Sequence, residues 1–381
     1  MRNMGMKKAI TVIACLIYIV TCHAQALGEH YYFESLNIRD GLSQNTIHTI
    51  LQDSKGFMWF GTKDGLNRYD GLFFKKFKCN KEDARSIGDN YIISLYEDAD
   101  GNIWIGTDVG LYIYYPETEI FEPFKQVSSE NTRIDHTVSM VKGDNKGHIW
   151  IAVERQGVFC YNLLTKQLKN YTLEKFPFIK SNVNTLTYDN SGTIWIGCNG
   201  SGLFYSKDNF HTLHPYQSPD GQKVFENDVI TRTLFGAYNS LYVSSIAGGV
   251  KAVDLTSGKV RDLLVIDERG EKIWCRDLLA FSDDELWIGC ESGVYIYNLR
   301  TDKYVHLSSS AYDPYSLSDN AIYSLYKDRE GGVWIGSYFG GINYYSRSYT
   351  YFEKYYSIGA EGSLHGKRVR EFCQDNRGNI W

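Results

Sequence analysis

The sequence predicts an all-β fold: a seven-bladed β-propeller of four-stranded antiparallel blades, followed by the start of an eighth repeat. Three observations predict it. A tryptophan recurs every 45 to 47 residues, an Asp-x-x-Gly turn precedes most of these tryptophans, and each repeat contains four short stretches with period-two patterning. Aromatic residues make up 15% of the 381 residues, and Gly outnumbers Pro by 35 to 6, which suits short strands joined by tight turns.

The first 26 residues form a separate segment. Basic residues at positions 2, 7 and 8 precede an apolar run over 9–20, and Ala24 and Ala26 give a small-x-small cleavage pattern. This predicts a secretory signal peptide over 1–26 and therefore a periplasmic location. A transmembrane anchor is the alternative, but about 13 apolar residues fall short of the roughly 20 that span a bilayer. Cys22 would mark a lipoprotein, yet Thr21 before it fits a lipobox poorly.

The tryptophans define the repeat. Seven of the eight obey the spacing, and Tyr242 takes the place of tryptophan in the fifth copy. The seven are Trp59, Trp104, Trp150, Trp195, Trp287, Trp334 and Trp381. We expect seven complete copies to form a propeller over 27–350, and a truncated copy over 351–381 to begin a second propeller.

Each repeat divides into four strands. In the first copy, a strand over 47–50 precedes the turn 53–56; the strand with Trp59 follows, and then come strands over 65–69 and 73–77. In the turn, Asp accepts backbone N–H bonds and Gly takes the left-handed conformation that a side chain makes costly. We expect each tryptophan ring to fill the gap between neighbouring blades.

Ring closure has two possible registers. Residues 31–36 resemble the fourth-strand stretches, so the N-terminal segment is expected to complete the last blade and remove exposed sheet edges. In the competing register, residues 351–356 belong to that blade. The sequence leaves both open.

The repeated motif resembles that of a known family. Asp-x-x-Gly-x-Ile-Trp-Ile-Gly-Thr-x-x-Gly-Leu-x-x-Tyr, preceded by Leu42-Ser-Gln-Asn45 or Leu317-Ser-Asp-Asn320, resembles the two-component regulator propeller repeat. The copies at Tyr242 and Trp287 depart from the pattern. The resemblance implies the N-terminal periplasmic sensor region of a bacterial hybrid two-component system, in a parent protein anchored in the inner membrane and carrying a histidine kinase that this fragment lacks.

The same resemblance implies a function and partners. Many family members are similar to sensors of glycan fragments, so we expect an oligosaccharide or other small ligand and self-association through the full-length sensor region. Membrane contact would come only through absent downstream segments. A free-standing propeller that binds a partner or carbohydrate is the alternative, and a propeller glycosidase or lyase is a weaker one, because no paired carboxylates or Ser/His/Asp set stands out.

Candidate ligand-binding residues are those that break the repeat on one face. Turns between second and third strands should share a face with the loops that enter the first strands. There, Trp274 and Arg276 lie where other copies have smaller residues, and Arg155 and Tyr338 replace small or acidic residues. An aromatic platform beside an arginine suits a carbohydrate; the alternative is that Trp274 serves packing or a domain interface.

Other chemistry is not indicated. Six cysteines outside the signal segment show no C-x-x-C spacing, which argues against a zinc site, and Cys198 and Cys290 fit small buried positions on strands. The net charge of −5 and the lack of a basic stripe argue against nucleic-acid binding. We therefore expect no catalytic residues, no metal and no cofactor in this chain, and we do not expect it to be an enzyme.

Overall fold

The computed structural model describes residues 31–129, 131–144, 146–172, 175–176, 182–346, 354, 356, 363–364 and 369–381. The signal peptide predicted over 1–26 lies outside these residues, as do most of 347–368. Two compact units are present, of which the larger spans Phe33–Tyr345. The 3-10 helices η1 (Ile38–Asp40) and η3 (Ala237–Asn239) are three residues each, and no helix in the described part of the chain has the length and apolar character needed to cross a membrane.

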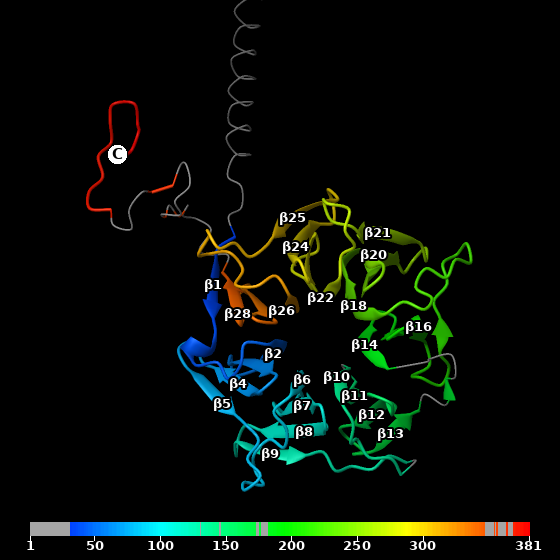
Figure 1. Cartoon of the computed structure of the whole chain (residues 1–381). Helices are drawn as coiled ribbons and strands as arrows, with labels where there is room; N and C mark the ends of the chain where they lie inside the picture. The colour runs from blue at the N-terminus through cyan, green and yellow to red at the C-terminus, as the bar shows by residue number, and fades with distance from the viewer. Residues whose placement is uncertain are drawn as a thin grey trace, which may run out of the picture. The chain divides into compact units, whose positions relative to one another are not determined.

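The larger unit is a seven-bladed β-propeller, as the sequence predicts. Seven four-stranded antiparallel sheets surround an axis, and the first strand of each blade lies nearest to it (Figure 1). The first three blades comprise β2 (Ile47–Gln52), β3 (Met58–Thr62), β4 (Gly65–Tyr69) and β5 (Phe74–Phe77); β6 (Ile92–Glu97), β7 (Ile103–Thr107), β8 (Gly110–Tyr115) and β9 (Ile120–Pro123); and β10 (Val138–Gly143), β11 (His148–Val153), β12 (Gly157–Asn162) and β13 (Leu168–Tyr171).

Blades four to seven repeat this order. They comprise β14 (Val183–Tyr188), β15 (Ile194–Cys198), β16 (Gly202–Ser206) and β17 (His214–Pro215); β18 (Ile230–Gly236), β19 (Ser240–Ser245), β20 (Gly249–Asp254) and β21 (Val260–Leu264); β22 (Cys275–Ala280), β23 (Glu285–Cys290), β24 (Gly293–Asn298) and β25 (Lys303–Leu307); and β26 (Ile322–Lys327), β27 (Val333–Ser337), β28 (Ile342–Tyr345) and β1 (Phe33–Leu36).

The N-terminal strand closes the ring. β1 pairs antiparallel with β28, with Phe33 opposite Tyr345 and Leu36 opposite Ile342. The Phe33 ring is buried, and its backbone N–H donates to the carbonyl of Tyr315 at 2.8 Å. Of the two registers that the sequence allowed, the structure has the one in which residues 33–36 complete the last blade.

The Asp-x-x-Gly turn joins first and second strands and also binds the tryptophan. Asp53 Oδ1 accepts from the backbone N–H of Phe57 at 2.9 Å, while Oδ2 accepts from Trp59 Nε1 at 2.7 Å. Gly56 of this turn has a φ of 95°, the left-handed conformation expected. The same carboxylate–indole bond recurs in Asp98–Trp104, Asp189–Trp195, Asp328–Trp334 and Asp375–Trp381 at 2.9 to 3.2 Å.

Blades three, five and six depart from this arrangement; in the fifth, Tyr242 replaces the tryptophan. In the sixth, which lacks the turn glycine, Glu285 Oε1 accepts from Trp287 Nε1 at 2.6 Å instead. In the third, His148 Nδ1 lies 3.0 Å from Asp144 Oδ2, and Trp150 Nε1 is buried with no partner among the described residues. His148 thus binds the Asp144 oxygen that is equivalent to the one that binds the indole in other blades.

The tryptophan rings pack between blades, which confirms the expectation from the sequence. Trp59 of the first blade lies 5.2 Å from Tyr114 of the second, between ring centroids, and Trp334 of the seventh lies 5.5 Å from Phe60 of the first. A buried cluster between the first two blades unites Trp59 with Ile92 and Ile103. The core is therefore a series of inter-blade layers, because each sheet buries both faces against its neighbours.

A glycine lies two residues after most of the tryptophans, and this close packing favours it. A Cβ built on Gly106 would lie 2.8 Å from both Val138 Cγ1 and Val138 O of the next blade, and 2.3 Å from Ser94 Oγ. Val138 is fully buried at that contact. The second strand of one blade thus approaches the first strand of the next too closely for most side chains.

Outside the propeller, described residues 369–381 hold the start of the eighth repeat. Asp375 accepts from Asn379 N at 2.9 Å and from Trp381 Nε1 at 3.2 Å, and Gln374 bridges to Ile380. The same turn opens the second strand in most blades of the propeller.

Candidate functional site

One face of the propeller gathers the second-to-third strand turns and the entries to the first strands. In blades three to seven a backbone hydrogen bond joins the two, for example from Tyr338 N to Ala321 O at 2.9 Å and from Glu291 N to Trp274 O at 3.1 Å. The same bond runs from Asn199 N to Asn182 O at 2.9 Å in the fourth blade. The loop face expected from the sequence is therefore present, and it surrounds the mouth of the central channel.

Every first strand carries a β-bulge at its second residue. The register shifts in all seven sheets, at His48, Ile93, Ser139, Asn184, Thr231, Arg276 and Tyr323. Because β-bulges re-aim a side chain and the first strands line the axis, these seven positions form a ring. Their contacts with one another, given below, show that the ring lies at the loop face.

Three of the seven bulge positions carry small side chains that join neighbouring blades. Ser139 Oγ donates to Val183 O at 3.0 Å, Asn184 Nδ2 to Ile230 O at 2.9 Å, and Thr231 Oγ1 to Cys275 O at 2.8 Å. Each bond runs from one blade to the next. These three side chains therefore connect blades three to six and leave their hydrogen-bonding groups engaged.

In blades six, seven and one the bulge residue is large, and these side chains stack on one another and on Tyr91, which directly precedes β6 in blade two; the bulge residue of blade two is Ile93. The Arg276 guanidinium lies 4.8 Å from the ring centroid of Tyr323; Tyr323 lies 6.0 Å from His48, and His48 lies 5.0 Å from Tyr91 in a stacked arrangement. These four residues come from blades six, seven, one and two. They form a continuous arc around half of the channel mouth.

Two residues from the turns complete the arc. Tyr338 lies 5.1 Å from Tyr323 between ring centroids, and its hydroxyl accepts a 2.7 Å hydrogen bond from Lys63 Nζ. We call the six residues Arg276, Tyr323, Tyr338, His48, Lys63 and Tyr91 the mouth cluster. All six are half-buried, so they are held in place yet reachable from solvent.

Charges in the mouth cluster are unevenly matched. Arg276 pairs with Glu291 at 2.6 Å. Lys63 makes no ion pair with any described residue; its hydrogen bond with Tyr338 raises its pKa, so it stays charged. Burial, and then the charge of Lys63, lower the pKa of His48 to about 4, so the imidazole is neutral at neutral pH. Its Nε2 is buried with no partner among the described residues.

The channel wall next to the mouth is fixed by a buried carboxylate. Asp277, which follows Arg276, pairs with Arg232 of the fifth blade at 2.7 Å and accepts from Leu325 N of the seventh at 2.9 Å. Its burial raises its pKa, and the positive charge of Arg232 opposes that shift. Asp277 thereby joins three blades and fixes the backbone that carries Arg276 and Tyr323.

The residues predicted from the sequence are only partly brought together. Arg276 and Tyr338 both contact Tyr323 and belong to the mouth cluster. Trp274 is 49% exposed beside them, at the entry to β22. Arg155 lies in the β11–β12 turn of the third blade, where its N–H donates to Asn182 Oδ1 at 3.0 Å, across the ring from the sixth blade.

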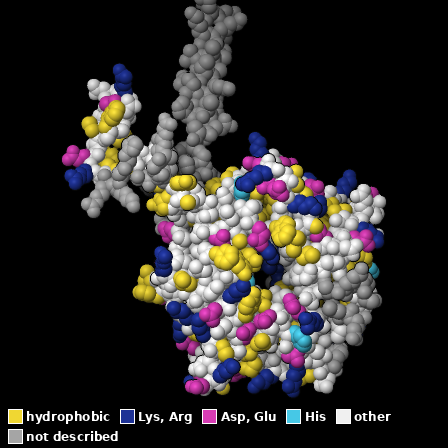
Figure 2. Space-filling model, in the orientation of Figure 1, with side chains coloured by type: hydrophobic (Ala, Val, Ile, Leu, Met, Phe, Trp, Pro, Cys, Tyr) yellow, Lys and Arg dark blue, Asp and Glu magenta, His cyan; other side chains and the backbone are white. Residues whose placement is uncertain are grey.

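His48, Lys63, Tyr91 and Tyr323 were missed as candidates. For His48 and Tyr323 the signal in the sequence is size: at the bulge position, copies three to five carry Ser, Asn or Thr, whereas copies six, seven and one carry Arg, Tyr and His. In the space-filling view the propeller is hollowed at its centre, and Lys or Arg atoms and hydrophobic side chains border the hollow (Figure 2).

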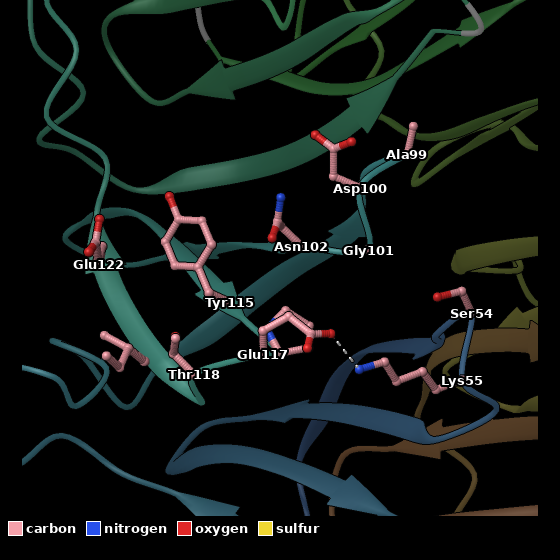
Figure 3. Close-up of a pocket in the computed structure, with 12 residues that line it drawn as sticks. Ser54, Lys55, Ala99, Asp100, Gly101, Asn102, Tyr115, Glu117, Thr118 and Glu122 are labelled. Carbon is pink, nitrogen blue, oxygen red and sulfur yellow. Dashed lines mark hydrogen bonds and ion pairs between the residues drawn. The ribbon is translucent and has the colours of Figure 1, made fainter.

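A groove of about 540 Å³ lies on the opposite, turn-bearing edge of the first two blades. Lys55 and Glu117 meet across it at 3.2 Å, and Ser54, Asp100 and Asn102 line it (Figure 3). Ser54 Oγ donates to Glu97 at 2.6 Å. These side chains belong to the structural turns, so the groove is less suited to a ligand than the mouth cluster.

Metal-binding and cysteine chemistry are not indicated by the described part of the chain. There, no group of three or more His, Cys, Asp or Glu side chains is placed to hold a metal ion. The six cysteines recorded are free thiols; Cys198 and Cys290 are buried on strands, as the sequence predicts.

Part of the repeated sequence matches the model of a known family. The model of the family "Two component regulator propeller" matches residues 41–64, 86–109 and 316–339. The chain carries two-component regulator propeller repeats. The three matched copies of this repeat lie in or next to blades one, two and seven and contain Lys63 and Tyr338.

One relative matches a short stretch of this chain. Histidine kinase P4 of Formosa agariphila is 39% identical over 87 residues, which cover 23% of this chain and 6% of the kinase. The chain thus spans a small part of that relative.

The fold is shared with solved structures. The extracellular domain assigned to a hybrid two component system of B. thetaiotaomicron has a TM-score of 0.75 at 23% identity, covering 92% of this chain and 46% of that one. A second such domain from the same organism has a TM-score of 0.70 at 18% identity, covering 83% and 40%. The chain spans less than half the length of either, and at these identities the likeness concerns the fold.

Proposed function

We propose that this chain is an extracellular, periplasmic sensing propeller of a hybrid two-component regulator, and that it binds a small ligand at the mouth cluster. The observation that carries the proposal is the asymmetric bulge ring. Blades three to five use small side chains to join neighbouring blades, whereas blades six, seven and one hold a half-buried Arg–Tyr–His arc. A purely structural ring would have no need of this difference.

The ligand we propose is a glycan fragment. Aromatic faces beside hydrogen-bond donors are well suited to a sugar, because apolar sugar faces pack on rings while hydroxyls pair with polar groups. Trp274, Arg276 and Tyr338 lie on this part of the loop face, and we retain them as ligand residues. Arg155 would contribute only to a ligand long enough to reach the third blade.

The proposal gives this chain a binding role and no catalytic one. Signalling would arise if the ligand binds one packing arrangement of a self-associated sensor region better than another, so that occupancy shifts the equilibrium. The kinase would belong to a downstream part of the parent protein, joined through an inner-membrane segment. A signal peptide over 1–26 would deliver the propeller to the periplasm.

Calorimetry of the purified chain with a panel of oligosaccharides tests the binding role. At least one should bind, and the double substitution Trp274→Ala with Arg276→Ala should weaken it at least tenfold. Lys55→Ala, on the opposite edge, is the matched control and should leave affinity unchanged. Unchanged affinity in the double variant would contradict the assignment of the site, and a gene that encodes no kinase or membrane segment downstream would contradict the sensor role.

A further inference from the structure

We propose that the ligand of the mouth cluster is an acidic saccharide, and that its carboxylate or sulfate group binds the ammonium of Lys63. This inference rests on the proposed function and adds the chemical class of the ligand. It is carried by three features of the cluster: one unpaired charge, several free hydrogen-bond donors, and aromatic faces around them.

Lys63 is the unpaired charge. Its neighbour Asp64 binds Lys78 and accepts from Asn90 Nδ2, and Arg276 is neutralised by Glu291. The only described hydrogen-bond partner of Lys63 Nζ is the Tyr338 hydroxyl, so two of its three N–H donors are free. Its Nζ also lies 4.7 Å from the centroid of the Tyr338 ring. The ammonium is therefore positioned but not neutralised, and an anionic group is the partner it lacks.

The groups beside Lys63 are also suited to an anion. The Tyr338 hydroxyl accepts from Lys63 and so keeps its own proton available to donate. His48 carries a neutral imidazole, so it adds no charge beside Lys63. Among the described carboxylates, Glu291 is the one that pairs with a member of the cluster, and its partner there is Arg276. A carboxylate on the ligand would thus meet donors and little repulsion.

The aromatic faces favour a sugar over a bare anion. Tyr323 and Tyr338 present tilted rings 5.1 Å apart, and Trp274 and Phe339 are 49% and 71% exposed at the rim. Inorganic sulfate would use the ammonium and leave the rings bare. A neutral oligosaccharide would cover the rings and leave the ammonium unpaired. An acidic saccharide satisfies both.

Calorimetry with four probes tests the proposal on the purified chain: tetragalacturonate, a sulfated tetrasaccharide, an uncharged galactose tetramer and inorganic sulfate. We expect one of the two acidic tetramers to bind at least tenfold more tightly than the uncharged tetramer and than sulfate. Lys63→Gln should weaken binding of that acidic tetramer about tenfold, because a charge-assisted hydrogen bond is lost. Tyr338→Phe, which keeps the ring but releases Lys63, should weaken binding less.

Controls separate this inference from the proposed function. Lys55→Gln removes a lysine from the same blade at its opposite edge and should change nothing; equal thermal midpoints would show that all variants fold. If the uncharged tetramer binds as tightly and Lys63→Gln has no effect, the acidic ligand is wrong while the sensor role stands. If sulfate binds as tightly as the tetramers, the saccharide is wrong. If no tetramer binds, the proposed ligand class fails with it.

Discussion

At the residue scale, a single Asp carboxylate both closes the turn and binds the tryptophan indole in most blades. Asp98 closes its turn by accepting from Asn102 N at 2.9 Å and fixes the indole of Trp104, also at 2.9 Å. The indole N–H is hydrogen-bonded to water in the unfolded chain and buried in the folded one. Without the carboxylate it would have no hydrogen-bond partner after folding, which lowers stability. The repeat therefore pairs Asp with Trp six residues later for a physical reason, and Trp150 is the natural exception.

The exception gives a matched pair of substitutions. Trp104→Phe removes both ring area and the bond to Asp98, whereas Trp150→Phe removes ring area and no hydrogen bond. We expect Trp104→Phe to lower the free energy of unfolding by about 1–3 kcal/mol more than Trp150→Phe. Urea denaturation of both variants measures this difference. Equal losses would mean that the carboxylate–indole bond adds nothing to stability.

His48 makes stability depend on pH. Its pKa is lowered to about 4 in the folded state from the usual 6.5, so the unfolded chain binds more protons between these values. Stability from this residue is therefore complete above pH 6.5 and is lost as pH falls toward 4. Between pH 7 and 4.5, the wild type should lose about 2 kcal/mol more than His48→Gln. Urea midpoints across this range test it; parallel curves for the two proteins would contradict the burial argument.

At the element scale, two local features determine how the strands pack against neighbouring blades and the central axis. Glycine after the tryptophan lets the second strand approach the next blade, and the bulge in each first strand turns one side chain toward the axis. The glycine is not needed in every blade: in the third, Ala152 occupies its position and is fully buried. Blade spacing therefore varies locally with side-chain size.

Gly106 tests this packing. Gly106→Ala places a methyl group against Val138 and should destabilise the propeller by about 1–3 kcal/mol through overpacking. The reverse change, Ala152→Gly, should cost about 1 kcal/mol or less, since it adds only backbone freedom. Thermal unfolding of the two variants compares them. A harmless Gly106→Ala would show that the blades can move apart at little cost.

Strands and turns could be predicted from the sequence because each is local and repeated. The bulge could not, because nothing in a period-two pattern marks where one extra residue enters a strand. For this reason Arg276 and Tyr338 were found as deviations from the repeat, while His48 and Tyr323 were not connected with them. Lys63 is unpaired because Asp64 pairs with Lys78 and Glu291 with Arg276, and the sequence does not specify these pairings. Ring closure stayed open because residues 31–36 and 351–356 have similar patterns.

At the scale of the whole molecule, closure depends on four residues from the start of the chain. β1 adds the outer strand to a blade whose other strands come from 322–345, so the ring is complete only when distant parts of the chain meet. Such a long-range contact must overcome the entropy of closing a large loop. The hydrophobic contact of Phe33 with Tyr345, 6.1 Å apart between ring centroids, helps to offset it.

Phe33→Ala should therefore destabilise the whole propeller. We expect a loss of about 3–5 kcal/mol, typical of removing a buried phenylalanine ring. Glu34→Ala, on the exposed side of the same strand, should stay within about 0.5 kcal/mol of the wild type. Denaturation curves followed by tryptophan fluorescence report all blades together. Loss confined to proteolysis of the N-terminal strand, with an unchanged midpoint, would show that the ring does not need its closing strand.

The pairing of β1 with β28 also has a mechanical consequence. Phe33 and Tyr345 are opposite each other at the end of the ladder where both chain directions leave the propeller. Tension between those two ends would load one residue pair at a time and open the seam like a zipper, whereas tension along the strands would have to break all the pairs together. The seam lies in the blade that carries Tyr323 and Tyr338. A pull on the propeller's ends would therefore be felt first in the blade at the centre of the mouth cluster.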